Sequence, residues 1–269
     1  MARSTSGESV LTRTMRILRA FGTVSGSLTV SEISRRADLP VATAHRLVGE
    51  LVELGALERE PDKRVRIGYQ LWEVASRSSP ARDLSRTALP YMEDLQVAVR
   101  EHTQIGVLEG TDVLYLERLS ARDAGRNVAE IAGRLPVHAT STGLVLLAHS
   151  PPELQERVLG GELREHTRHT VTDPVRLRRL LAAVRRDGYV IASRMIDPAA
   201  VGLAAPVRDR ENRVVAALSV VVPFLSDAGP QAHVPVLVAA ARGISRAMGA
   251  RISGEDMIHT RGHAPRPSA

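Results

Sequence analysis

Between residues 41 and 54, side chains that can donate hydrogen bonds alternate with apolar ones at helical spacing. The apolar positions, on one side of such a helix, are Val41, Ala44, Leu47, Val48, Leu51 and Leu54. The other side carries Ala42, Thr43, His45 and Arg46. An arginine fork matches the two acceptors of guanine, a hydroxyl can donate to a phosphate or a base, and an alanine methyl can touch a thymine methyl. This face indicates contact with duplex DNA, although an ordinary solvated helix face would use the same residues.

The elements around this face form a recognisable order. Periodicity and end signals predict helices at Ser9–Phe21 and Val30–Ala37, and a third helix from Val41 that Gly55 ends. Two short strands follow at residues 56–59 and 65–67. Three helices and a two-stranded ribbon constitute a winged helix-turn-helix, whose third helix enters the major groove.

Two further positions on this module are expected to meet phosphates. Thr29 and Glu32 have the spacing of a capping box, and the helix start with Thr29 and Ser31 is expected near a phosphate. Lys63 and Arg64 lie at the turn between the two strands, where they are placed to contact the DNA backbone. A plain surface turn is the alternative for these two cations.

In the rest of the chain, segments with helical spacing of apolar residues are interspersed with segments that are typical of strands. Helices are predicted over 84–99, 139–149, from 151 onward, 173–186 and 234–248, and strands over 105–108, 113–119, 188–192, 201–206 and 213–222. The last strand is almost continuously apolar and should lie centrally in its sheet. The fold class is therefore α+β. We expect a flexible start at 1–8, a winged helix-turn-helix at 9–70, a linker helix at 71–82, a second domain at 83–252 and a disordered tail at 253–269.

Composition limits the chemistry. The chain has 269 residues, a net charge of +6 and no cysteine. Disulfides, thiolate catalysis and cysteine metal sites are thereby excluded, which fits a reducing cytoplasm. Lys63 is the only lysine, and a codon bias explains why nearly all of the positive charge is arginine. The net positive charge nevertheless permits a polyanionic partner. With no run of eighteen apolar residues and no secretory signal, we expect a cytoplasmic protein without membrane contact.

No group of residues indicates catalysis. The G-x-S-x-G, P-loop and G-x-G-x-x-G patterns are absent, and Thr140-Ser141-Thr142-Gly143 is too weak a pattern for a nucleophile site. His166 and His169 could share a metal ion, but two ligands in an Arg-rich stretch favour a solvated turn. His138 is interpreted as structural. We expect no enzyme activity, metal or cofactor; a small-molecule-binding or hydrolytic domain with an appended interaction module is the alternative function.

Several segments carry a family resemblance. Leu28–Ile33, Leu39–Leu47 and Leu51–Gly55 resemble the DNA-binding half of the IclR-type bacterial transcriptional regulators. Signatures similar to that family's second half follow in the right order at Gly133–Thr140, Asp187–Tyr189, Ala204–Asp209 and Val214–Val220. The resemblance spans Val10 to Ile252 and implies a GAF-like effector domain, an operator-binding winged helix and a linker helix that pairs subunits. It also implies homodimers, or tetramers of two dimers, which suit a pseudo-palindromic operator.

The resemblance also implies positions for an effector pocket. These positions are Asn127, Leu135, Ser141, Thr142, Ala192, Ala200 and Gly202. Ser141 and Thr142, near a helix N-terminus, would suit a carboxylate through hydroxyl and backbone donors.

Three departures from the family pattern bear on the effector. Ala192-Ser193-Arg194 replaces an acidic run, Gly202 stands where cysteine is frequent, and Leu144 stands where lysine is usual. The position of Ala192 has lost an acidic acceptor, and Arg194 adds a cation nearby. Both changes favour an effector that is anionic, or that has fewer hydrogen-bond donors, and that Arg194 contacts. A solvent-facing Arg194 is the alternative. The sequence thus predicts a sequence-specific DNA-binding regulator, expected to be a repressor, whose operator affinity a small anionic organic effector gates.

Overall fold

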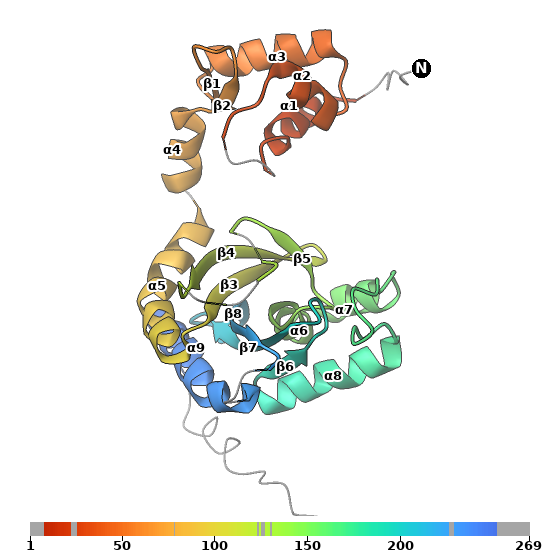
Figure 1. The fold of residues 1–269 in the computed structure, drawn as a ribbon, viewed down its shortest axis with the longest axis vertical. Helices are drawn as coiled ribbons and strands as arrows, with labels where there is room; N and C mark the ends of the chain where they lie inside the picture. Colours follow the sequence, from red (N-terminus) through yellow and green to blue (C-terminus); the bar gives the residue numbers. More distant parts are fainter. Residues whose placement is uncertain are drawn as a thin grey trace, which may run out of the picture. The chain divides into compact units, whose positions relative to one another are not determined.

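The structure, a computed structural model, describes residues 8–22, 26–77, 79–122, 124, 127–129, 131–225 and 229–251. The expected flexible start and tail lie outside these residues, Glu8 excepted. The chain divides into two compact units, Met1–Pro80 and Ala81–Ala269, and the division falls in the segment expected to be the linker (Figure 1). None of the described helices is both long enough and apolar enough to cross a membrane.

The first unit has the element order that the sequence predicts. Its elements are α1 (Val10–Arg19), α2 (Val30–Arg36), α3 (Val41–Glu53), β1 (Leu57–Arg59), β2 (Val65–Ile67) and α4 (Tyr69–Arg77). β1 and β2 pair antiparallel, and the buried core joins Ile17, Ile33, Leu47 and Leu57 from the first three helices and the ribbon, without α4. The three helices and the ribbon are therefore confirmed.

Local chemistry sets where the helices of this unit begin and end. The capping box of α2 is complete, with both the Thr29 and the Glu32 side chains bonded to backbone N–H groups. Gly55, just beyond α3, has a φ of 68°, and a Cβ there would lie 2.5 Å from the Gln70 side chain. The positive φ favours glycine at this turn, whereas the exposed Gln70 side chain could move aside.

The second unit is a six-stranded antiparallel sheet between helices. The strand order is β5 (Arg134–Pro136), β4 (Asp112–Ser120), β3 (His102–Glu109), β8 (Val214–Pro223), β7 (Ala200–Arg208) and β6 (Val190–Ser193). β8 lies between β3 and β7, as its continuous apolar sequence predicts. Apolar clusters cover both faces of β8, which explains why its sequence does not alternate.

Two groups of helices cover the two faces of this sheet. α5 (Pro80–Val99) and α9 (Val234–Ala247) pack on one face, with the short η1 (Pro230–His233) before α9 (Figure 1). α6 (Ser141–Ala148), α7 (Pro152–Leu159) and α8 (Pro174–Asp187) lie over the other. The α+β class is confirmed. β5 and η1, three and four residues long, escape the sequence patterns because they are too short to show a period.

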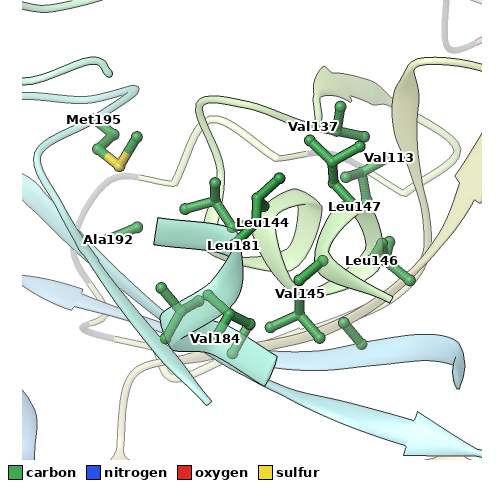
Figure 2. Close-up of a cluster of buried hydrophobic side chains, with 14 of the residues drawn as sticks. Val113, Val137, Leu144, Val145, Leu146, Leu147, Leu181, Val184, Ala192 and Met195 are labelled. Carbon is green, nitrogen blue, oxygen red and sulfur yellow. The ribbon is translucent and has the colours of Figure 1, made fainter. Parts of the chain in front are cut away.

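α6 is buried along its whole length and anchors the second unit's core. Figure 2 shows Leu144 of α6 next to Leu181 of α8, whereas Leu147 of α6 lies toward Val137 and Val113 in the same cluster. A Cβ on Gly143 would stand only 2.4 Å from the Val137 backbone. Glycine at this position therefore allows α6 to approach the chain that precedes it.

Candidate functional sites

α3 presents the expected polar face to solvent. Ala42, His45 and Arg46 are exposed and Thr43 is half-buried, while Ala44 and Leu47 face the core. The Arg46 guanidinium forms an ion pair with the carboxylate of Glu50, one turn further along the helix. Arg46 must leave this exposed partner to reach a base, which costs little because surface ion pairs contribute about 1 kcal/mol or less.

The start of α2 differs from the expected phosphate contact. The Thr29 backbone N–H and hydroxyl donate to the Glu32 carboxylate at 2.7 and 2.9 Å, and the hydroxyl accepts from the Glu32 backbone N–H at 3.2 Å. These bonds, chiefly those from Thr29, lower the pKa of Glu32. A carboxylate therefore already occupies this helix start, and Ser31 remains as its exposed hydroxyl.

The two cations at the ribbon turn differ in their surroundings. Lys63 is exposed, with a φ of 69°. Arg64 instead folds back, donating to the Ser27 carbonyl at 2.7 Å and lying 3.5 Å from Glu32. Lys63 is thus available at the turn, whereas Arg64 fastens the ribbon to the start of α2.

A cavity lies in the second unit between α6, the sheet and the β6–β7 loop. Its volume is about 440 Å³ when the open space at its entrance is included. The structure brings six of the expected effector residues together in its lining: Asn127, Leu135, Ser141, Ala192, Ala200 and Gly202. The strand register explains part of this set, because Ala192 pairs with Gly202 and Gly202 pairs with Val221 across β6, β7 and β8. A row of small side chains thereby leaves room above the sheet.

Polar groups enter this lining from several elements. The Asn127 amide donates to Gln104 Oε1 at 2.9 Å and accepts from the Ala129 backbone N–H at 3.0 Å. Tyr115 is almost completely buried, and this burial raises the pKa of its phenol, which therefore stays protonated as a donor at neutral pH. Asp197 is 9% exposed, and its Oδ1 accepts from the Ala199 backbone N–H at 2.8 Å.

The N-terminus of α6 opens at the same cavity. Thr140 caps the helix by accepting from the Gly143 N–H at 3.1 Å, which leaves the Ser141 and Thr142 N–H groups outside the helical pattern. Ser141 lies in the lining, and its Oγ is directed at Gly202. Thr142 lies outside the lining; its hydroxyl donates to Ser219 at 2.9 Å and so fixes α6 to β8.

Arg194 also lies outside the lining, in contrast to the expected effector contact. Its guanidinium carbon lies 4.0 Å from the centre of the Phe224 ring. The Arg194 backbone has a φ of 57°, its N–H donates to the Ala200 carbonyl, and its carbonyl accepts the Thr167 hydroxyl at 2.6 Å. Arg194 therefore shapes the β6–β7 loop that carries Met195 and Asp197, since the stacked cation holds the loop against the end of β8.

Three of the histidines in the second unit, His138, His166 and His169, make local contacts and do not line the cavity. His138 bonds the Arg164 carbonyl at 2.9 Å, and the His138 and His166 ring centres are 5.9 Å apart. His169 contacts the neighbouring Arg168. Burial and the nearby His138 and Arg164 lower the pKa of His166. Among the residues that the structure describes, no three His, Asp or Glu side chains come together as a metal site.

The sequence interpretation missed ten lining residues: Gln104, Tyr115, Val128, Ala129, Ala139, Thr140, Met195, Ile196, Asp197 and Val221. One signal was available for Gln104, because it lies directly before the apolar residues of a predicted strand, where glutamine is an uncommon core residue. Asp197 had none beyond a turn-forming Asp-Pro pair, since only the folded loop brings it to the cavity.

Each of the two units matches a known protein family. Residues 78–246 match the family described as bacterial transcriptional regulator IclR C-terminal, and residues 10–61 match the IclR helix-turn-helix domain. The chain is 30% identical to the HTH-type transcriptional regulator BhcR of Paracoccus denitrificans, over 93% of this chain and 91% of that protein. It is 30% identical to the regulator XynR of Escherichia coli, over 77% of this chain and 83% of that protein.

Solved structures give a similar result. An IclR homologue from Microbacterium hydrocarbonoxydans, crystallised in complex with 4-hydroxybenzoate, is 50% identical to this chain. The match covers 89% of this chain and 99% of that one, with a TM-score of 0.85. A regulator from Rhodococcus is 28% identical, with a TM-score of 0.74 over 88% of this chain and 97% of that one.

Proposed function

The chain belongs to the IclR family of bacterial transcriptional regulators, and on this premise we propose that it is a repressor whose operator affinity is set by a small aromatic carboxylate. It joins a helix-turn-helix domain that binds DNA to a C-terminal domain that binds a small effector. The proposed domain bounds are 9–70 and 83–252, with residues 71–82 as the linker.

The observation that supports the effector class best is the α6 start at the cavity. Ser141 lines the cavity there, and its hydroxyl and backbone N–H lie at the positive end of a helix. Donors of this kind suit a carboxylate. The 50% identical homologue binds 4-hydroxybenzoate, which makes an aromatic acid of that size the first ligand to test.

On the DNA side, Arg46 is proposed to contact a guanine edge, with Thr43, His45 and Ala42 beside it in the major groove. Lys63 is proposed to contact a phosphate. Thr29 and Arg64 act indirectly, since their bonds to Glu32 and Ser27 hold the α2 start and the ribbon in place.

A homodimer, or a tetramer of two dimers, is proposed to present two such faces to a pseudo-palindromic site. The surface of α4 supports pairing through the linker, because Tyr69, Trp72 and Val74 are 68%, 62% and 66% exposed. Tyr69 and Trp72, about one turn apart, share one side of this nine-residue helix and give it an exposed aromatic surface that a second subunit can cover.

The proposed mechanism is linkage between the two sites. An effector that binds one arrangement of the subunits more tightly shifts the population toward that arrangement, and operator affinity changes by the same differential free energy. By reciprocity, operator DNA must change effector affinity by the same factor.

Fluorescence anisotropy tests this proposal. The DNA beside the chain's own gene and a random duplex are titrated at two salt concentrations, with and without 4-hydroxybenzoate. Arg46→Ala should lose about 1–3 kcal/mol on the operator and less on random DNA. Arg178→Ala is the matched control, because Arg178 is also an exposed arginine paired with a glutamate, on α8 in the other unit. Equal losses on both duplexes would refute base reading, and operator affinity unchanged by the acid would refute this effector class.

A further inference from the structure

The cavity holds one acid that its proposed carboxylate ligand must avoid. Asp197 is 9% exposed and, among the lining residues that the structure describes, carries the one charged side chain. Its Oδ1 accepts from the Ala199 N–H at 2.8 Å. None of the described residues bonds its second carboxylate oxygen, Oδ2. A ligand that fills the cavity displaces water from this carboxylate, which then keeps its hydrogen bonds only if the ligand itself donates one.

Electrostatics then orients the ligand. Two carboxylates held together in a partly buried site repel each other, so the acid group of the ligand is disfavoured beside Asp197. The α6 start, with Ser141 in the lining and the positive end of the helix behind it, attracts the same acid group. The ligand's carboxylate therefore lies at α6, and whatever part of the ligand meets Asp197 must donate a hydrogen bond.

Resting on the proposed function, we propose that Asp197 makes the site specific for acids that carry a second, donating group. The ligand class is a hydroxy- or amino-substituted aromatic carboxylate, and Asp197 is the residue that selects the hydroxyl or amine. An acid without that group would leave the Asp197 carboxylate desolvated and unpaired when it fills the cavity, and sites built around such an acceptor reject analogues that lack the donor.

The loop around Asp197 is fastened so that the acceptor is positioned before the ligand binds. Thr167 and Thr170 donate hydroxyl hydrogen bonds, each of 2.6 Å, to the carbonyls of Arg194 and Met195. The guanidinium of Arg194 stacks on Phe224, which holds the first residue of the loop against the segment after β8. A held acceptor gains more from a matching ligand than a mobile one, because its ordering cost is already met.

A purely structural aspartate is the competing interpretation. The Oδ1 bond to the Ala199 N–H is an Asx-type turn, and an asparagine would make the same bond. Asp197→Asn therefore keeps the turn and removes the charge. If the residue serves only the turn, this substitution changes neither affinity nor selectivity.

Calorimetric titration of the full-length protein with 4-hydroxybenzoate, benzoate and 4-methoxybenzoate tests the proposal. The wild type should bind 4-hydroxybenzoate about 10- to 100-fold more tightly than either of the others, because a hydrogen bond to a charged acceptor has that effect. Methoxybenzoate keeps the oxygen but cannot donate. In Asp197→Asn the preference for the hydroxyl should fall below about threefold, and benzoate should bind at least as tightly as before.

Asp187→Asn is the matched control, because Asp187 is an exposed acid at the end of α8 that pairs with Arg186. It should leave all three affinities unchanged. Equal binding of benzoate and 4-hydroxybenzoate by the wild type, or an undiminished preference in Asp197→Asn, would overturn the role of Asp197 and leave the proposed function standing. Failure of the wild type to bind any of the three acids would overturn both. Equal binding of the three acids by the wild type would overturn the role of Asp197 even if the variant does not fold.

Discussion

Replacing Gly202 with alanine should weaken effector binding while leaving the fold almost intact. A Cβ on Gly202 would lie 2.6 Å from Ser141 Oγ and 3.2 Å from Ser141 Cβ. The first distance is too short for any ordinary contact, whereas the second needs only a small adjustment. Gly202 lies in β7 and its φ is not positive, so its backbone accepts alanine without strain. The least costly relief is rotation of the Ser141 hydroxyl away from its present direction.

The size of the effect follows from what that hydroxyl does. A hydrogen bond from a neutral donor to an ionised carboxylate contributes about 1.5–3 kcal/mol, which is about 10- to 100-fold in Kd. Turning the Ser141 hydroxyl away should raise the Kd for 4-hydroxybenzoate by up to that factor. The fold should lose about 1 kcal/mol or less, because one rotatable oxygen moves and no backbone atom must shift.

The assay is a double-mutant cycle read by calorimetric titration and thermal unfolding. Gly202→Ala, Ser141→Ala and the double variant are compared with the wild type. If the methyl acts by displacing the hydroxyl, the double variant should bind the acid no more weakly than Ser141→Ala alone. If alanine at Gly202 weakens binding by the same factor with and without the hydroxyl, the methyl simply fills ligand space, and the reasoning is refuted.

Three further outcomes are expected. Glu50→Gln should tighten binding to all DNA and steepen its salt dependence, because it frees Arg46 and removes a negative charge from the α3 face; weaker binding in anisotropy titrations would contradict this. Gly143→Ala should lower the free energy of unfolding, measured with urea, by about 1–3 kcal/mol, because its Cβ would lie 2.4 Å from the Val137 backbone. Gly49→Ala is the control: it has open space around it and should not destabilise the fold. Burial, helped by nearby arginines, lowers the pKa of His149, so the unfolded chain gains a proton first as pH falls. The stability from this residue should be present above about pH 6.5 and decline below it, and His149→Gln should flatten that decline in urea unfolding measured from pH 7.5 to 5.

The sequence by itself was sufficient for the elements that a local pattern specifies. The capping box at Thr29 and Glu32, the apolar stripe of α3 and the hairpin of β3 and β4 each lie within a few neighbouring residues. The central place of β8 also followed, because an unbroken apolar run must be covered on both faces. Family resemblance added the six cavity residues, which periodicity could not have found.

Only the tertiary structure decided how the charged side chains are used. Arg64 bonds Ser27, 37 positions away, and Arg194 stacks on Phe224, 30 positions away, so neither has a local partner that a sequence pattern could reveal. Asp197 enters the cavity because the β6–β7 loop turns through a positive φ at Arg194 and is bonded to the 167–170 segment. Hydrogen bonds and stacking between distant segments fix such loop conformations, and periodicity, which reports only which face of an element is buried, carries no information about them.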